Sequence, residues 1–182
     1  MRPTILATCV FAAACGGQAL DSPTSPSSAA SSPAQTPAQS GTELPFSGSF
    51  TIATTGVLNC PPTCPPTTVR INGIEEGSAT YLGRFTAVSV DVVDLAAATS
   101  TGTFDFTAAN GDQLFTTTIG HDDEFQPPNN LAAVIVATIM GGTGRFEEAT
   151  GTLTIRFAGI LDFASGTSSG SGSLEGHISL NR

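Results

Sequence analysis

The sequence predicts an all-β domain of about eight antiparallel strands, either a closed barrel or a sandwich, behind an N-terminal leader and linker. Two observations support this fold class. After Phe46 apolar and polar residues alternate with a period of two, which is typical of strands with one buried face. Thr, Val, Ile and Phe supply the strand propensity of these segments, and no segment shows convincing helical periodicity.

Glycine and proline separate the expected strands. The strands are expected at residues 47–53, 67–71, 79–95, 103–107, 113–119, 131–140, 152–161 and 173–180. Gly83 marks a bulge or bend within the long segment 79–95. Asn110-Gly111 predicts a type I′ hairpin turn, because both central positions of that turn need positive φ. The segment 131–140 is apolar at nearly every position and is expected to be buried on both faces.

The first residues form an export signal. One arginine and a short apolar run make residues 1–14 a signal peptide, too short to span a bilayer. Small residues directly before Cys15 resemble the lipobox of bacterial lipoproteins, so Cys15 is expected to carry a lipid at the mature N-terminus. Ordinary cleavage after an Ala-x-Ala site is the alternative. The expected location is the bacterial outer membrane or cell surface, or otherwise secretion.

A linker of low hydrophobicity follows the signal. Residues 22–42 contain Ser, Pro, Ala, Thr, Gln and one Gly, with no charged residue. Such a segment cannot bury enough apolar surface to offset its ordering entropy. The expected organisation is a disordered linker over residues 15–44 and a β-domain over residues 45–182.

The charged residues exclude several classes of function. The chain of 182 residues carries a formal net charge of −9, and all six of its basic residues are arginine. Lysine Schiff bases and P-loop lysines are therefore excluded. No basic stripe is present for nucleic acid or an anionic membrane surface. We expect no cofactor, no nucleic-acid partner, and membrane contact only through the N-terminal lipid.

Two clusters could suggest a metal. Cys60 and Cys64 are separated by three residues, but the chain offers no matching histidine pair, so a local disulfide is the expected state in an exported protein. The segment 121–124, His-Asp-Asp-Glu, lacks the ligand spacing of a calcium loop and is expected to be a solvated acidic loop. No metal site is expected.

Two further features are given a structural interpretation. His177 lies in an expected strand near Leu174 and Ile178 and is expected to be a hydrogen-bonded structural residue. Residues 166–170 match the Gly-x-Ser-x-Gly pattern of hydrolases, but they are expected to lie in a Ser/Gly-rich linker without the strand–turn–helix that a nucleophile elbow needs. No catalytic residue is assigned.

One segment resembles a known family. Residues 141–151, Gly-Gly-Thr-Gly-Arg-Phe-Glu-Glu-Ala-Thr-Gly, are similar to the glycine turn of allene oxide cyclase and dirigent barrels, and residues 79–85 are similar to a stretch in bacterial exported proteins with such barrels. In the turn, Phe146 is expected to close the barrel end. The resemblance implies an eight-stranded antiparallel barrel with an apolar lumen, often a trimer. Asp91 and Asp105 lie in expected strands, but the resemblance does not assign them a role.

Aromatic residues are the candidate ligand-binding set. Five of them are expected to line one end of a lumen: Tyr81, Phe85, Phe104, Phe106 and Phe157. Plain core packing is the alternative. The expected function is binding of a small hydrophobic molecule in the cell envelope, not conventional catalysis. A cyclase or isomerase acting on a lipid-derived substrate and a purely structural envelope barrel are the alternatives.

The apolar segment 131–137 also predicts self-association. One of its faces can fill the lumen, while the other, expected to be Leu131, Ala133, Ile135 and Ala137, would be an exposed apolar patch on a monomer. A homo-oligomer such as a trimer would bury it. Cover by the chain's own loop, residues 162–172, is the competing explanation.

Overall fold

The structure, a computed structural model, describes residues 42–59, 68–126 and 130–181, and in residues 53–59 and 122–126 it describes only the backbone. The chain divides into two units, residues 1–38 and 39–182, and the described residues all belong to the second. The expected signal peptide, Cys15, nearly all of the expected linker and the Cys60–Cys64 pair lie outside the described residues.

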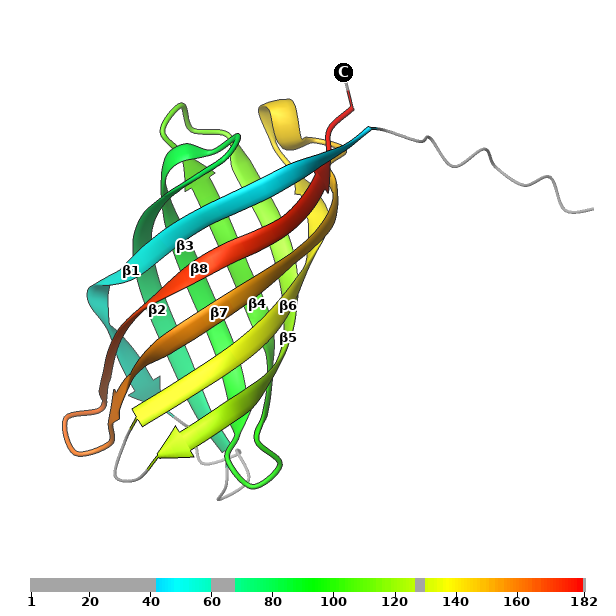
Figure 1. Cartoon of the computed structure of the whole chain (residues 1–182). Helices are drawn as coiled ribbons and strands as arrows, with labels where there is room; N and C mark the ends of the chain where they lie inside the picture. Colours follow the sequence, from blue (N-terminus) through cyan, green and yellow to red (C-terminus); the bar gives the residue numbers. More distant parts are fainter. Residues whose placement is uncertain (1–41, 60–67, 127–129, 182) are drawn as a thin grey trace, which may run out of the picture. The chain divides into compact units, whose positions relative to one another are not determined.

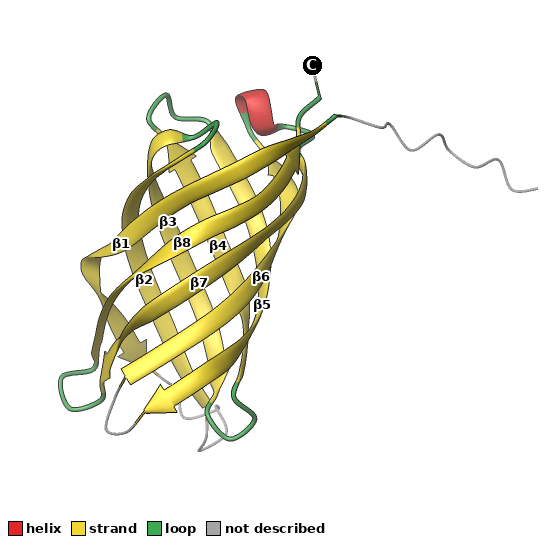
Figure 2. Cartoon of the chain, in the orientation of Figure 1, coloured by secondary structure: helices red, strands yellow, loops and turns green. Residues whose placement is uncertain are grey.

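The second unit is a closed barrel of eight antiparallel strands, which confirms the predicted fold class (Figures 1 and 2). The strands are β1 Glu43–Asn59, β2 Thr68–Ala79, β3 Gly83–Asp94, β4 Thr99–Ala108, β5 Gln113–Gln126, β6 Asn130–Gly142, β7 Thr150–Asp162 and β8 Thr167–Ser179. A short 3₁₀ helix, η1 Gly144–Phe146, lies between β6 and β7. Among the described residues, no helix is long and apolar enough to cross a membrane.

Each strand pairs with its neighbours in sequence, and β1 closes the circle by pairing antiparallel with β8. Glu43 pairs with Ser179 at one end of this seam, and Val57 pairs with Thr167 at the other. In Figure 1 the two strands run side by side, cyan and red. Closure leaves no free sheet edge.

The barrel has two different ends. The η1 end carries the turns at residues 80–82 and 109–112 and the η1 segment, together with the start of β1 and the end of β8. The opposite end carries the turns at residues 95–98 and 163–166, together with the end of β1, the start of β2, the end of β5 and the start of β6.

The expected single strand over residues 79–95 is wrong. β2 continues to Ala79, residues 80–82 form a turn, and β3 begins at Gly83. Tyr81 and Gly83 both have φ of 65°, a left-handed conformation that reverses the chain instead of bulging it. Alternation in the sequence continues through this turn, so periodicity alone does not reveal the reversal.

The turn at Asn110-Gly111 also differs from the expectation. Gly111 has φ of 91°, but Asn110 does not have positive φ, so the turn is not type I′. The Gly111 N–H donates to the Ala108 carbonyl, and the Ala108 N–H donates to the Asp112 carbonyl. This is the three-residue hairpin in which a glycine follows an ordinary turn. The Asn110 side-chain oxygen accepts the Asp112 N–H at 3.2 Å and stabilises the turn.

Inward-facing apolar side chains fill the η1 half of the barrel. Phe106 contacts Phe85 and Phe104 with ring-centroid distances of 5.2 Å and 4.9 Å, and Phe104 contacts Phe50 at 5.2 Å. Phe146, on η1, is fully buried and closes this end, as the glycine turn led us to expect. Aromatic contacts of this geometry add to the free energy of burial.

Within a single chain β6 is buried on its inner face alone, and burial of its outer face against another copy stays a prediction. The expected orientation of its apolar row is wrong. Leu131, Ala133 and Ala137 point into the barrel and are buried, and Ile135 lines its interior. Val136 and Met140 point outward and are 46% and 62% exposed. An Ile135 substitution would therefore change the lumen, not the outer surface.

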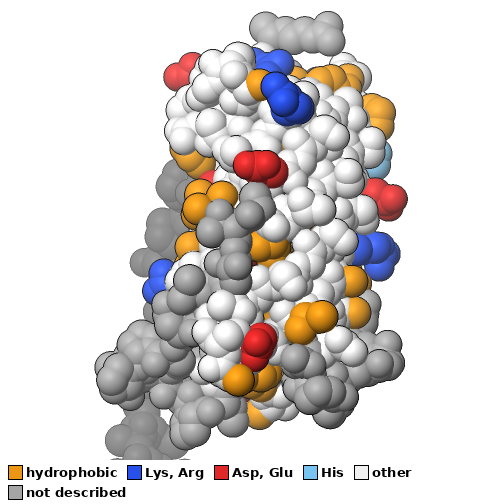
Figure 3. Space-filling view, turned by 90° about the vertical axis from the view of Figure 1, so that its left-hand side faces the viewer, with side chains coloured by type: hydrophobic (Ala, Val, Ile, Leu, Met, Phe, Trp, Pro, Cys, Tyr) orange, Lys and Arg blue, Asp and Glu red, His pale blue; other side chains and the backbone are white. Residues whose placement is uncertain are grey.

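Exposed apolar side chains on the outside come from several strands. Ile119 on β5 is 70% exposed and pairs with Val136 on β6, and Val88 on β3 pairs with Ile74 on β2. Figure 3 shows one face of the molecule, on which hydrophobic side chains lie in small separate groups and few side chains are charged. The expected oligomer stays a prediction.

The expected covering loop over residues 162–172 is wrong. Residues 163–166 form a tight turn, and β8 begins at Thr167. The Asp162 carboxylate accepts the N–H groups of Ala164 and Ser165 at 3.0 Å and 3.2 Å, which holds the turn. This turn is part of the barrel end and does not cover β6.

Candidate functional site

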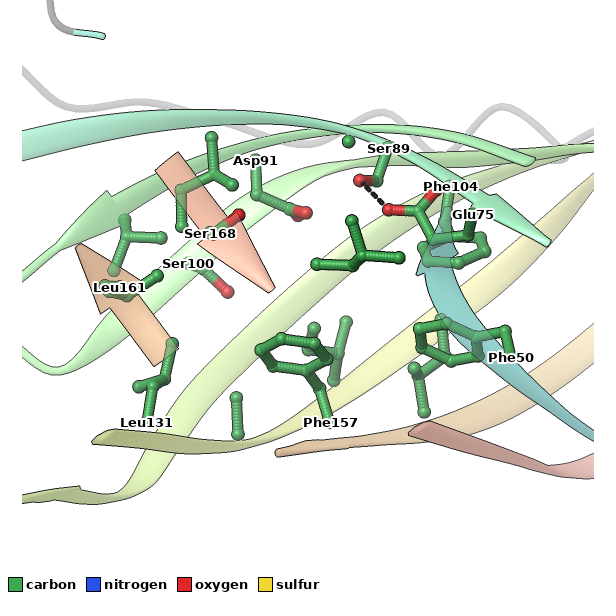
Figure 4. Close-up of a pocket in the computed structure, with 17 residues that line it drawn as sticks. Phe50, Glu75, Ser89, Asp91, Ser100, Phe104, Leu131, Phe157, Leu161 and Ser168 are labelled. Carbon is green, nitrogen blue, oxygen red and sulfur yellow. Dashed lines mark hydrogen bonds between the residues drawn. The ribbon is translucent and has the colours of Figure 1, made fainter. Parts of the chain in front are cut away.

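A cavity of about 60 Å³ lies inside the barrel, in the half away from η1 (Figure 4). Five of its lining residues stand one or two positions from the strand ends at that barrel end: Val93, Ser100, Leu131, Leu161 and Ser168. Phe104 also lines the cavity and separates it from the packed half. The barrel is therefore filled at one end and hollow at the other. A single buried water molecule needs at least ~10–15 Å³, so the cavity is larger than a single water site.

Glu75 projects into this cavity from β2. Its side chain is buried, and its Oε1 accepts a hydrogen bond of 2.7 Å from the Ser89 hydroxyl on β3. Gly73 makes this arrangement possible, because a Cβ at Gly73 would collide with the Glu75 carboxyl and the Ser89 hydroxyl. The second carboxyl oxygen, Oε2, is buried without a hydrogen-bond partner.

Asp91 projects into the same cavity from β3. Its Oδ1 accepts a hydrogen bond of 3.2 Å from the Thr118 hydroxyl, which lies two strands away on β5. Gly102 on β4 is the register partner of both residues. Because Gly102 has no side chain, Asp91 can reach across β4, and a Cβ there would collide with the Asp91 carboxyl.

Both carboxyl groups hold their protons more tightly than usual. Burial raises the pKa of Glu75 from 4.5 to about 7; the Ser89 hydrogen bond opposes this rise, and the negative charge of Asp91 adds to it. Burial raises the pKa of Asp91 from 3.8 to about 6, opposed by the hydrogen bond from Thr118. Near neutral pH the cavity therefore contains a carboxyl pair that changes its protonation state.

A further polar residue faces the cavity from β8, at the seam with β1. Ser168 on β8 is 3% exposed, and its Oγ has no hydrogen-bond partner. The expectation that residues 166–170 are a linker is wrong, since 167–170 begin β8. The Gly-x-Ser-x-Gly match is nevertheless not a nucleophile elbow, because a strand, not a helix, follows the turn.

Aromatic rings make up much of the apolar wall. Phe50, Phe104 and Phe157 line the cavity together with aliphatic side chains. In Figure 4 Phe157 on β7 faces the Glu75 and Asp91 carboxyl groups across the lumen. A Cβ at Gly170 would collide with the Phe157 ring, and a Cβ at Gly172 would collide with the Phe50 ring. Glycines thus provide the room for these rings.

The structure divides the five expected ligand-binding aromatics into two groups. Phe104 and Phe157 line the cavity. Phe85 and Phe106 lie in the packed core of the η1 half, and Tyr81 lies in the turn at the η1 end, packed against that core. Their joint role in ligand binding stays a prediction, and the cavity brings together only two of them.

Other residues that the sequence singled out lie away from the cavity. Asp105 is on the outer face of β4, where its Oδ1 accepts the Thr116 N–H at 3.1 Å. His177 is exposed on the outer face of β8. The expectation that residues 121–124 form a loop is wrong, because β5 continues through them and they pair with β6. The side chains of residues 122–124 lie outside the described part of the chain. Among the described residues, no three His, Cys, Asp or Glu side chains are grouped as a metal site would need.

Sequence reasoning missed most of the polar lining. Glu75, Ser89, Ser100 and Ser168 were not candidates, and Asp91 was noted only for its place in a strand. A signal was present, because Asp91 is in phase with Ala87 and Val93, which are buried. An acid at an inward position of a strand indicates a polar group inside the barrel.

No protein-family model and no curated protein matches the sequence. Solved structures are similar. The pterocarpan synthase dirigent protein PsPTS1 has a TM-score of 0.55 and 11% identity, over 77% of this chain and 96% of that chain. The pterocarpan synthase dirigent protein GePTS1 has a TM-score of 0.57 and 15% identity, over 83% of this chain and 96% of that chain. This likeness shows a dirigent-like barrel fold, as the glycine turn led us to expect.

The raised pKa values predict how stability depends on pH. The folded state binds the Glu75 and Asp91 protons more tightly than the unfolded state does, so their contribution is fully present below about pH 4 and is lost as pH rises through 6 to 7. For Glu75 the loss is about 3 kcal/mol of unfolding free energy. Glu75→Gln should remove this part of the pH dependence, as urea unfolding at pH 4 and pH 8 would measure.

Glu76→Gln is the matched control, because Glu76 is the next residue and points outward into solvent. This variant should keep the pH dependence of the unmodified protein. Equal pH dependence in Glu75→Gln and the unmodified protein would show that Glu75 ionises as an ordinary exposed carboxyl.

Proposed function

We propose that this protein binds a small hydrophobic molecule inside the half of the barrel opposite η1. The observation that carries the proposal is the cavity itself, which is apolar over most of its lining and contains a few convergent polar groups. A cavity with this lining is the usual form of a small-molecule site.

The contrast between the two halves supports the proposal. In the η1 half Phe85, Phe106 and Phe146 are buried in the packed core. In the other half Gly73 and Gly102 contribute no side chain to the interior, and the residues around them leave a cavity. An eight-stranded barrel is just wide enough to be filled by side chains or to hold one small ligand.

Filling the cavity should abolish binding. Ala133 on β6 is 6% exposed and lines the cavity, so Ala133→Leu places three more carbon atoms in the space. We expect a hydrophobic molecule to co-purify with the unmodified protein and to be lost from this variant. Organic extraction followed by mass spectrometry detects the co-purified molecule. Calorimetric titration of the variant with benzyl alcohol should show an affinity about tenfold or more below that of the unmodified protein.

Ala132→Leu is the control, because Ala132 is the preceding residue and points out of the barrel. It should bind as the unmodified protein does. If no hydrophobe is extracted and benzyl alcohol does not bind the unmodified protein, ligand binding is excluded and a purely structural barrel is favoured.

A cyclase or isomerase is the second candidate, favoured by the raised pKa of Glu75, which is about 7. A buried carboxyl that keeps its proton near neutral pH is suited to general acid catalysis in an apolar pocket. The reaction would open and rearrange an unsaturated epoxide derived from a lipid. The two similar dirigent proteins are named as pterocarpan synthases, and that activity belongs to those two proteins.

The enzymatic alternative predicts turnover that depends on this carboxyl. An unsaturated fatty-acid epoxide should be converted by the unmodified protein, and Glu75→Gln should lower kcat by about 100-fold or more. Glu76→Gln should retain full activity, since that side chain is exposed. Chromatography of the products, compared with those of the uncatalysed reaction, measures this turnover. The same product yield with and without protein would exclude the enzymatic alternative.

We further propose that the barrel is exported and held at the cell envelope through Cys15. The apolar leader, the small residues before Cys15 and the uncharged linker support this. Because β1 begins at the η1 end, such a tether would join the barrel at the end away from the cavity.

The anchor predicts the mass of the mature protein. Protein purified from membranes should begin at Cys15 and carry added acyl mass, as intact mass spectrometry would show. A mature chain that begins elsewhere without acyl mass would exclude the anchor but leave export in place.

A further inference from the structure

The described lining of the cavity carries two acidic side chains and no basic one. Glu75 and Asp91 are its titratable groups, and the polar residues around them, Ser89, Ser100, Thr118 and Ser168, do not titrate. The described arginines are all exposed on the outside: Arg70, Arg84, Arg145 and Arg156. Within the described residues, no protein cation therefore neutralises the pair.

Two buried polar atoms show that the cavity is an incomplete hydrogen-bonding site. Among the described side chains, the buried atoms without a partner are Glu75 Oε2 and Ser168 Oγ, and both residues line this cavity. A buried polar atom that is left without a hydrogen bond destabilises the folded protein. Each of the two atoms could accept a hydrogen bond from a donor in the cavity.

Glycines at inward positions maintain this polar arrangement. A Cβ at Gly73 would displace the Glu75 carboxyl, and a Cβ at Gly102 would displace the Asp91 carboxyl. A Cβ at Gly120 would collide with the Ser100 hydroxyl. Three strands, β2, β4 and β5, thus leave out a side chain where a polar group of the cavity needs room.

The opposite wall is aromatic. Phe157 faces the carboxyl pair across the lumen, and Phe50 also lines the cavity, while Phe104 is the register partner of Ser89 and lies on the carboxyl side (Figure 4). The face of an aromatic ring is electron-rich and attracts a cation that has lost its water. Carboxylates on one side and rings on the other both favour positive charge between them.

We propose that the ligand of this lumen is a small hydrophobic amine, whose ammonium group lies between Glu75 and Asp91 and whose apolar body packs against the phenylalanine rings. This inference rests on the proposed function, ligand binding in the lumen, and specifies the chemical class of the ligand. The ammonium group donates up to three hydrogen bonds, so it can donate to both carboxyl groups between which it lies.

A neutral hydroxyl compound fits the same space less well. One hydroxyl donates a single hydrogen bond and leaves the repulsion between the two carboxylates in place. An ammonium group removes that repulsion and makes charge-assisted hydrogen bonds, which are roughly twice as strong as neutral ones. The amine should therefore bind more tightly than the hydroxyl compound at a pH at which the carboxyl pair is ionised.

The test compares benzylamine with benzyl alcohol, which share the same ring and differ in the polar group. Isothermal titration of the full chain at about pH 7.5 should show benzylamine binding about tenfold or more tightly than benzyl alcohol. At about pH 5, where Glu75 and Asp91 retain their protons, this preference should be lost. Because the amine favours the ionised carboxyls, binding near pH 6.5 should release protons, seen as a binding enthalpy that changes with the buffer.

Variants assign the preference to the two carboxyls. Glu75→Gln and Asp91→Asn should each weaken benzylamine binding by about tenfold or more and leave benzyl alcohol within a factor of about three. Glu76→Gln is the control of equal charge change and should alter neither affinity. Circular dichroism and thermal unfolding establish that each variant folds, and where Asp91→Asn does not fold, Glu75→Gln and the buffer dependence decide.

The outcomes separate this inference from the proposed function. Equal binding of the two compounds, with no proton release and no effect of Glu75→Gln, would overturn the amine inference and leave ligand binding in place. Binding of neither compound would overturn both. Tighter amine binding that is equally reduced by Glu76→Gln would overturn the inference as well, because it would reflect the net negative charge of the protein.

Discussion

Pairing between β1 and β8 closes the sheet, and this closure fixes how much interior space the inward side chains must share. A barrel of eight strands has room for side chains or for one small ligand, but not for a wide channel. Every inward position is therefore coupled to the positions around it. Large residues such as Phe50 and Phe157 lie beside glycines at Gly172 and Gly170, where a Cβ would collide with the rings.

The same constraint creates the two halves of the interior. In the η1 half the aromatic side chains of the neighbouring strands β3 and β4 pack together, and Phe146 closes the end. In the other half the inward series contains Ser89, Ser100 and Ser168, together with glycines, and these small residues cannot fill the same width. The cavity is the volume that remains, and Phe104 marks the boundary.

Placing carboxyl groups in that remaining volume couples the fold to the chemistry. The fold tolerates the buried carboxyl groups of Glu75 and Asp91 because each receives a hydrogen bond from one hydroxyl. In each case a glycine also leaves room for the carboxyl group. Yet neither receives a positive partner from the described residues, and burial raises the pKa of both groups. The resulting site costs stability when it ionises, and a bound cation would recover that cost. Ionisable groups whose pKa is shifted by burial in this way are often found at functional sites.

The sequence by itself determined the all-β class, the number of strands and the glycine turn that ends in Phe146, because these depend on local alternation, propensity and turn chemistry. It misplaced the reversal at Tyr81 and the direction of Leu131 and Ile135, since alternation shows that faces differ but not which one is inward. Only the tertiary structure decided that Glu75, Asp91 and Ser168 share one cavity. These residues lie far apart in the chain, and closure with a specific register brings β2, β3 and β8 around the same space.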